Sequence, residues 1–533
     1  MLPGLLSYGA IVLLVVLSIF SPFLASIYLL LIIITMLVKV VGMAVHTIMG
    51  HRRLKYAMNL DWHTRLVQLE HPVQSYKLVR DHYSNSMDYE VHQENLRLMS
   101  ANPDQFPRPS DVYNAVIIAA YNEPYEVIQP TLEALVASSY DTSHMILVFA
   151  YEERGGEAIR HTVERLRDSY QEHFKKFMLV MHPADLPDEV MGKGPNITYA
   201  GYKLEQWCAE QGIKKRNVII TTLDCDNKPY KSYFDYLTYE YIVHEDRKHL
   251  SYQPLALYFS NIWDVPAPMR IIATGNSFWT LIVSMRPHLL RNFAAHSQPM
   301  DALSEMGYWS KRSIVEDGHQ YWRSYFHFGG DYRVIPIHVP IYQDAVLADS
   351  LKTTLIAQFK QLRRWAYGAS DVPYVGIRVF TKLRNVPFWS GLTRFYTLLD
   401  SHVTLAVISL LVAVGAWVPL LINPEASREI AAHNLPEVVS VLQRFAMIGL
   451  FVTILISMRM LPKRPERYKR NKSVFMVLQW VLMPITAILY NSMAAFTAQT
   501  YLLRGKYLDK FDVTEKATFE TASRAKQSRR NKK

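Results

Sequence analysis

The chain has 533 residues, enough for two or three domains, and carries a formal net charge of +11. Half of its residues are apolar and one in five is charged, which is too polar for a pure membrane bundle and too apolar for a typical soluble enzyme. The basic residues crowd beside apolar runs, which favours contact with membrane lipid and excludes a nucleic-acid-binding protein. Two cysteines, Cys208 and Cys225, predict no disulfide framework.

Residues 1–45 are predicted to form an N-terminal transmembrane hairpin. Two apolar runs, 5–20 and 23–38, are separated by Ser21-Pro22. Each run is short for a span, but together they can form a helical hairpin or one long broken anchor. Residues 46–110 are polar and mixed, and we interpret them as a helical linker region.

Residues 111–345 have the pattern of an α/β domain. Short β-branched runs occur at 115–118, 145–148, 177–180 and 217–220. Stretches with helical periodicity, such as 125–138 and 158–174, separate several of them. Buried strands that alternate with helices predict a mainly parallel, Rossmann-like sheet. Because such sheets bind ligands at the carboxyl ends of their strands, active-site residues are expected directly after the runs.

The chain then returns to the membrane. Residues 346–400 are predicted to form amphipathic helices at the membrane interface, and 401–503 a C-terminal transmembrane region. The runs 403–422 and 445–460 are long enough to span.

The apolar run 474–503 is longer and contains Pro484. The loop before it and the tail 504–533 are both strongly basic and are expected in the cytoplasm. If both lie there, this run is a re-entrant hairpin or an interfacial helix broken at Pro484. The alternative is a single span with the tail outside.

Polar residues follow two of the predicted strands. Asn122 and Glu123 follow the first, where they can hydrogen-bond to a base or ribose, although Asn and Pro here also suit a plain turn. Asp224 and Asp226 follow the fourth and point the same way in an extended segment. Two carboxylates at a strand end suit a hard cation that bridges phosphate oxygens, although a solvated acidic turn looks the same.

Two further groups of residues can carry chemistry. Glu316 and Asp317 form an acidic pair that can deprotonate a hydroxyl group, although such pairs also cap helices. Gln361, Arg364 and Trp365 lie together on an amphipathic stretch. An Arg can bind a diphosphate and a Trp can stack on a sugar, while the same side chains also suit a helix that only anchors the chain.

Taken in this order, the motifs resemble glycosyltransferase family 2, and within it the membrane-integrated synthases of the cellulose synthase and hyaluronan synthase type. The match extends from about residue 111 to residue 516, and the motifs are specific as an ordered set rather than singly. The resemblance implies a cytosolic catalytic domain with the α/β GT-A fold, combined with transmembrane and interfacial helices. It also implies an inverting transfer from a UDP-sugar.

The resemblance gives each matching position a role. Those that would bind the donor are Tyr121, Asn122, Glu123, Glu152, Lys193, Asp224, Gln361, Arg364, Trp365, Thr514 and Lys516. Asp317, with Glu316, would carry the catalysis, and Asp226 would bind Mg²⁺ or Mn²⁺. Gly275 and Asn276, together with Trp365, would lie near the acceptor.

Two positions depart from the family pattern. Glu152 stands where the family usually has an aspartate, and Val315 replaces the threonine of the Thr-Glu-Asp motif. Residues 511–516 fit the F-x-V-T-x-K gating loop, which closes over the donor and must therefore be cytoplasmic. This agrees with the position that the basic charge predicts for the tail.

These observations predict a multi-pass cell-membrane enzyme that transfers a sugar from a nucleotide-sugar donor to a growing polysaccharide. An alternative is a non-processive transferase that adds one or a few sugars to a lipid-linked or cell-wall acceptor. A third hypothesis, a nucleotide-regulated membrane transporter without catalysis, predicts that Asp317→Asn leaves activity intact. Membrane lipid is an expected partner, and nucleic acid is not.

Overall fold

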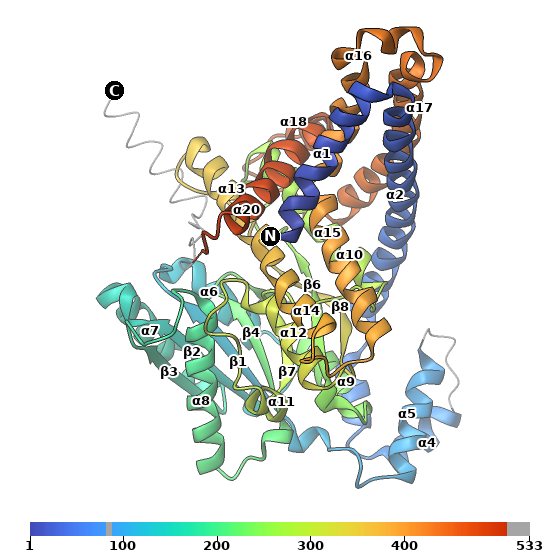
Figure 1. Ribbon diagram of the computed structural model, residues 1–533. Coiled ribbons are helices and arrows are strands. Elements are labelled where there is room, and N and C mark those ends of the chain that lie inside the picture. Colours follow the sequence, from blue (N-terminus) through green and yellow to red (C-terminus); the bar gives the residue numbers. More distant parts are fainter. Residues whose placement is uncertain (82–87, 509–533) are drawn as a thin grey trace.

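A computed structural model describes residues 1–81 and 88–508 (Figure 1). Within them, eight strands form one sheet in the order β3-β2-β1-β4-β7-β6-β8-β5. The strands are β1 (Tyr113–Ala120), β2 (Met145–Glu152), β3 (Lys176–His182), β4 (Val218–Asp224), β5 (Lys228–Pro229), β6 (Leu250–Leu257), β7 (His296–Pro299) and β8 (Arg333–Tyr342). Strands β3, β2, β1 and β4 are mutually parallel, while β7 runs antiparallel to both β4 and β6. The predicted fold class, a Rossmann-like α/β domain joined to long apolar helices, is confirmed.

Helices cover both faces of this sheet. They are α6 (Tyr125–Val136), α7 (Gly156–Tyr170), α8 (Lys193–Glu210), α9 (Tyr233–Val243), α10 (Ala267–Ser284), α11 (Met300–Glu305) and α12 (Glu316–His327). Because successive side chains of a strand point to opposite faces, Val116 and Ile118 of β1 pack in the core formed with α6, α7 and α9. Ala115 and Ile117 pack on the other side with α8 and α11. Both faces are therefore buried, as the continuous apolar runs predict.

Two long helices follow each other at the N-terminus, α1 (Leu2–Phe20) and α2 (Pro22–Asn59). Ser21 breaks them apart: its Oγ accepts a hydrogen bond from the backbone N–H of Leu24 at 3.4 Å, and Pro22 starts the new helix. Helix α2 continues to Asn59 and so passes the predicted boundary at residue 45. The short helices α3 (Trp62–Gln68), α4 (Pro72–Asp81) and α5 (Tyr89–Ala101) complete the N-terminal region.

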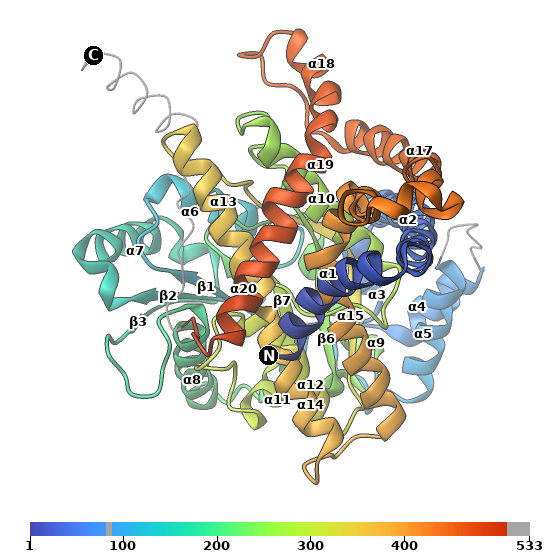
Figure 2. The same ribbon diagram turned by 45° about the horizontal axis from the view of Figure 1, so that its top comes forward.

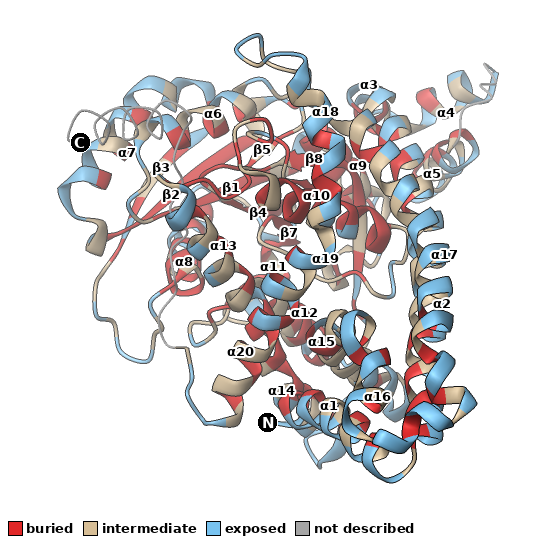
Figure 3. Ribbon diagram, turned by 90° about the horizontal axis from the view of Figure 1, so that it is seen from above, coloured by how far each residue is buried: buried red, intermediate tan, exposed pale blue. Residues whose placement is uncertain are grey.

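The remaining helices lie C-terminal to the sheet. They are α13 (Leu351–Ala366), α14 (Asp371–Phe380), α15 (Phe388–Val414), α16 (Val418–Ile422), α17 (Ile430–Met460), α18 (Asn471–Leu478), α19 (Met483–Thr486) and α20 (Met493–Leu503). In the described part of the chain, five helical stretches are long and apolar enough to cross a membrane: Leu2–Phe20, Pro22–Asn59, Phe388–Ile422, Ile430–Met460 and Asn471–Leu503. The outward face of α17 exposes Ile448, Phe451 and Leu455, as a lipid-facing helix would. Figure 3 shows this exposed face beside the buried sheet.

The apolar run around Pro484 does not turn back on itself. Helices α18, α19 and α20 follow one course without a reversal (Figures 2 and 3). The hairpin interpretation of residues 474–503 is therefore wrong, because Pro484 stands at the start of α19, where a missing N–H is tolerated. A single continuous helical stretch remains, and its last part, α20, packs on α13.

Candidate active site

A cavity of about 180 Å³ opens at the carboxyl ends of β1, β2 and β4, where the sheet predicts a site. The predicted site residues that line it are Tyr121, Glu123, Glu152, Lys193, Asp224, Asp226, Glu316, Asp317, Gln361, Arg364 and Trp365. They come from strand ends, from the starts of α8 and α12, and from helix α13 above them. Residues as far apart in sequence as 121 and 365 thus share one cavity.

One end of the cavity is formed by the strand ends of β1 and β2. Glu123 folds back on the chain, and its Oε2 accepts hydrogen bonds from the backbone N–H groups of Tyr121 at 2.8 Å and Asn122 at 3.2 Å. Glu152 is 5% exposed and forms an ion pair with Arg154. The guanidinium of Arg154 lies 5.6 Å from the centroid of the Tyr121 ring. This end offers an aromatic face with paired charges beside it, which suits a nucleoside.

Close backbone approach at two glycines shapes this cavity. A Cβ on Gly155 would lie 1.9 Å from the carbonyl oxygen of Tyr121. A Cβ on Gly194 would lie 2.4 Å from the carbonyl oxygen of Ser310 and 3.1 Å from Cβ of Glu316. Any larger residue would push these backbones apart. Glycine therefore allows the start of α8, which carries Lys193, to lie against the start of α12.

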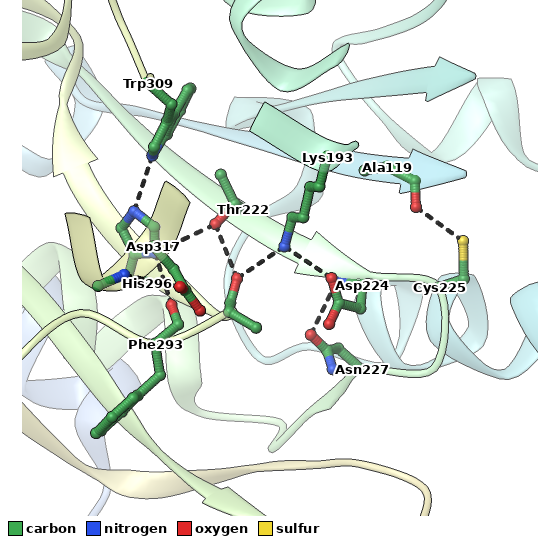
Figure 4. A network of polar contacts seen from close by, with 12 residues as sticks. Ala119, Lys193, Thr222, Asp224, Cys225, Asn227, Phe293, His296, Trp309 and Asp317 are labelled. Atoms are coloured by element: carbon green, nitrogen blue, oxygen red, sulfur yellow. Dashed lines mark hydrogen bonds and ion pairs between the residues drawn. The ribbon is translucent and has the colours of Figure 1, made fainter. Parts of the chain in front are cut away.

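Lys193 lies at the centre of the polar network that Figure 4 shows. Its Nζ donates to Oδ1 of Asp224 at 2.7 Å and to the carbonyl oxygen of Ala294 at 2.9 Å. Burial by itself would lower the pKa of Lys193, but the adjacent carboxylate of Asp224 outweighs burial and raises that pKa. The side chain, only 9% exposed, is therefore a fixed positive charge in the cavity wall.

Asp226 and Asp344 are brought together by a strand pair. Asp226 follows β4 and is 4% exposed, and its Oδ2 lies 3.3 Å from the backbone N of Asp344. Lys228 of β5 pairs with Tyr342 of β8, which places both carboxylates on the cavity wall. Among the described residues, no cluster of three or more histidine, cysteine or acidic side chains could hold a metal by itself. Mg²⁺ needs only one or two carboxylates when a substrate phosphate completes its shell, so Asp226 fits such an ion, and Asp344 would fit it on leaving its 3.3 Å ion pair with Lys228.

The acidic pair of α12 opens that helix. Glu316 is its first residue, and the backbone N–H of Gly318 donates to Oδ1 of Asp317 at 2.7 Å. Burial, reinforced by the neighbouring Asp317, raises the pKa of Glu316 to about 8. Burial also raises the pKa of Asp317, against the opposing effect of the Gly318 N–H and the Lys193 charge. Glu316 therefore keeps its proton at neutral pH, while the hydrogen bond to Gly318 favours the ionised form of Asp317.

This shifted glutamate makes the stability of the protein depend on pH. The pKa of Glu316 is raised from 4.5 to about 8, so between these values the folded protein holds a proton that the unfolded chain has lost. Its stabilising contribution is fully present below pH 4.5 and is lost as pH rises to about 8. The Glu316→Gln protein should not show this loss. Relative to the unmodified protein, its free energy of unfolding should gain about 2–4 kcal/mol at pH 8. Thermal unfolding in detergent between pH 5 and pH 8 measures it.

The matched control for this prediction is Glu90→Gln, which changes an exposed glutamate of α5. Its melting temperature should follow that of the unmodified protein at every pH. If the Glu316→Gln and Glu90→Gln proteins lose stability equally between pH 5 and pH 8, Glu316 does not hold the extra proton.

Helix α13 closes the cavity from above. Ser350 and Thr353 form a capping box that starts the helix: the Thr353 N–H donates to Ser350 Oγ at 3.2 Å, and the Ser350 N–H to Thr353 Oγ1 at 3.0 Å. Gln361, Arg364 and Trp365 then lie one turn apart and face the cavity. Trp365 is 37% exposed, and its ring centroid lies 6.1 Å from that of Tyr258.

Some predicted residues lie elsewhere. Asn122 is exposed and does not line the cavity. Gly275 and Asn276 lie within helix α10, also outside the cavity lining, so the structure does not bring them to the other site residues. Thr514 and Lys516 lie outside the described residues. Lining residues that the sequence motifs missed are Arg154, Tyr258, Ala294, Gln343 and Asp344.

Comparison with known proteins gives weak structural likeness only. No protein-family model matches the chain, and no curated protein matches it. Among solved structures, it is similar to the mannosyltransferase PcManGT from Pyrobaculum calidifontis in complex with GDP-Man and Mn²⁺, with 13% identity, a TM-score of 0.39 and coverage of 82% of this chain and 98% of that one. It is also similar to residues 1–349 of TarS from S. aureus in complex with UDP-GlcNAc, with 12% identity, a TM-score of 0.34 and coverage of 74% and 93%.

A third similar structure is glucosyl-3-phosphoglycerate synthase from Mycobacterium tuberculosis with Mn²⁺, UDP and phosphoglyceric acid. The identity is 12%, the TM-score 0.28, and the match covers 46% of this chain and 78% of that one. At these scores the likeness does not bear on the chemistry of the cavity, which has to be read from its own residues.

Proposed function

We propose that this protein is a membrane-embedded, inverting glycosyltransferase that transfers a sugar from a nucleotide-sugar donor, a UDP-sugar, to a growing polysaccharide. The observation that carries the proposal is the content of one cavity. It holds an acidic pair in which Glu316 is buried and Asp317 half-buried, the fixed charge of Lys193 and the acidic residues that follow β4 and β8, and α13 lies over them. Since α13 packs on α20, the last part of an apolar stretch long enough to span, the site would lie directly against the membrane.

Asp317 is the proposed general base. It takes the proton of an acceptor hydroxyl while that oxygen attacks the anomeric carbon of the donor. The bond from that carbon to the nucleoside diphosphate breaks on the opposite side, so the anomeric configuration inverts. The raised pKa of Asp317 makes its carboxylate a stronger base than an exposed aspartate. Glu316, which keeps its proton, would avoid a second negative charge beside it.

The leaving diphosphate needs positive charge. Lys193, held by Asp224 before the donor binds, supplies it from the cavity wall, and Arg364 supplies it from α13. Asp226 and Asp344 would hold Mg²⁺ or Mn²⁺, which when bound neutralises diphosphate oxygens. Trp365 offers the ring on which an acceptor sugar can stack, and Tyr121 with Glu152 would bind the nucleoside.

The experiment is a donor panel. The full-length protein in detergent, with Mn²⁺ or Mg²⁺, is given one nucleotide sugar at a time, and release of nucleoside diphosphate is measured. We expect release from one donor and none after chelation of the metal. A product of many sugars supports the polysaccharide assignment, while a product of one or a few supports transfer to a lipid-linked or cell-wall acceptor. Donor binding without release, in protein that is folded, would contradict catalysis and favour the regulatory transporter.

A further inference from the structure

A short segment before β7 forms the part of the cavity wall that receives Lys193. Side chains contact each of its carbonyl groups, and Figure 4 shows those around Thr222 and His296. Gln253 of β6 accepts from the N–H of Phe293 at 2.8 Å and donates to the carbonyl of Ala295 at 2.8 Å. Thr222 of β4 donates to the carbonyl of Ala294 at 3.1 Å. The segment is therefore fixed from two strands, and its Ala294 carbonyl presents one oxygen to Lys193 at 2.9 Å.

The remaining carbonyl, that of Phe293, depends on His296. Nδ1 of His296 lies 2.8 Å from this oxygen, and Nε2 lies 3.0 Å from Nε1 of Trp309. The indole N–H can only donate, so Nε2 of His296 has to accept, and the ring proton has to be on Nδ1. His296 and Trp309 are each 1% exposed, so no water competes for either contact. Trp309 thus determines which nitrogen of His296 donates to Phe293.

Burial keeps this histidine neutral. It lowers the pKa of His296 to about 4, against the small opposing effect of the Phe293 carbonyl and with the help of the nearby Lys193 charge. A neutral ring can donate from one nitrogen and accept on the other, as the two contacts require. His296 has no part in the proposed sugar transfer, so its burial behind the cavity wall indicates another role.

We propose that His296 and Trp309 are positioning residues for Lys193: Trp309 fixes the tautomer of His296, and His296 fixes the Phe293–Ala294 turn whose carbonyl orients the lysine ammonium. The contacts form one chain from Trp309 through His296 and Phe293 to Ala294 and Lys193, and from there to Asp224 at 2.7 Å. The consequence for catalysis rests on the proposed function, in which Lys193 stabilises the leaving diphosphate. The positioning of Lys193 by His296 and Trp309 does not depend on that function.

Two substitutions of His296 separate its contact with Phe293 from its contact with Trp309. The amide of asparagine reaches the place of Nδ1, so His296→Asn keeps a donor for Phe293 and loses the Trp309 contact. The amide of glutamine reaches the place of Nε2, so His296→Gln keeps the Trp309 contact and loses the donor. We expect His296→Gln to lower kcat by about 10–100-fold with a smaller change in donor KM, because a misplaced charge acts on the transition state. His296→Asn should recover most of this loss.

A second readout needs no activity. Amine-acylating reagent is added to the folded protein, and acylation of Lys193 is compared by peptide mass spectrometry with that of Lys203, which lies on the same helix outside the cavity. We expect Lys193 to be acylated several times faster in His296→Gln and in Trp309→Phe than in the unmodified protein. Ser297→Ala, which changes an equally buried β7 residue bonded to Thr221 and Tyr233, should leave this ratio unchanged.

The two readouts can fail separately. If no donor is turned over but Lys193 becomes reactive in His296→Gln and Trp309→Phe, the positioning holds and the proposed function is wrong. If Lys193 reactivity in these proteins equals that in Ser297→Ala, His296 serves only the core and the inference is overturned. Equal kcat losses in the glutamine and asparagine proteins would overturn it as well, since the donor to Phe293 would then not matter.

Discussion

Replacement of Asp317 by asparagine is expected to lower the rate of sugar transfer by about 10²–10⁴-fold, the usual contribution of a general base. Asparagine has nearly the same shape and still accepts the 2.7 Å hydrogen bond from Gly318, so α12 should begin as before. What is lost is the carboxylate that takes the acceptor proton. The Kd for the nucleoside diphosphate should therefore change by less than about threefold, because that part of the ligand is held elsewhere. Single-turnover transfer and calorimetric binding measure the two quantities.

The matched control for this change is Asp331→Asn, which alters an exposed aspartate outside the cavity lining. Its rate should equal that of the unmodified protein. If the Asp317→Asn protein keeps more than a tenth of the rate, Asp317 is not the base. Glu316 would then be the next residue to change, since it is the other acid of the pair.

Replacement of Asp226 by asparagine is expected to weaken the dependence of donor binding on metal. A carboxylate is a far better ligand for Mg²⁺ or Mn²⁺ than an amide, and the metal is worth several kcal/mol to the departure of a diphosphate. Since each 1.36 kcal/mol is a factor of ten in rate, we expect the Asp226→Asn protein to transfer sugar about 10²–10³-fold more slowly than the unmodified protein. Titration of Mn²⁺ in the presence of UDP, followed by electron paramagnetic resonance, should show the weakened site directly.

Asp344→Asn should change Mn²⁺ binding in the same direction, because Asp344 shares the cavity wall with Asp226. Asp349→Asn, an exposed aspartate a few residues further along, serves as the control and should behave as the unmodified protein. If UDP binds the Asp226→Asn protein equally well with Mn²⁺ and with chelator, and so does the unmodified protein, no metal takes part in donor binding.

The sheet could be predicted where strands are long and apolar. The runs at 115–118, 145–148, 177–180 and 217–220 became β1 to β4, because parallel strands covered on both faces have to be apolar throughout. Strand β7 could not be predicted in this way. It has only four residues, His296–Pro299, of which the first three are polar. Hydrogen bonds of their side chains to other buried groups compensate for their burial, and these contacts exist only in the folded chain.

The part of the site that follows the strands could also be predicted from the sequence. Residues that follow parallel strands have to meet at one edge of the sheet, and Glu123, Asp224 and Asp226 do line one cavity there. Asp344 and Arg154 were missed because their positions depend on pairing and on a local turn rather than on a motif. Gly275 and Asn276 fit a motif, but they lie in the middle of helix α10, outside the lining of the cavity.

The course of residues 474–503 illustrates a limit of charge arguments. Basic segments on both sides of an apolar run predict that its two ends share a compartment, which needs a reversal of the run or a course along the membrane surface. A reversal at Pro484 is one solution. The chain instead keeps a single direction through α19 and a π-helical turn, Ala487–Ser492, before α20.

Helix α2 has a practical consequence for anyone who wishes to produce this protein without its apolar helices. The C-terminal part of α2 belongs to the interior of the α/β domain, because Leu54 packs in one core with Leu255 and Leu257 of β6. The same core includes Ile456 of α17. At Gly50 the helix approaches so closely that a Cβ would lie 2.7 Å from the carbonyl oxygen of Leu281. A fragment trimmed to the α/β region alone would expose this interior to solvent and aggregate, so the full chain in detergent or nanodiscs is the appropriate material.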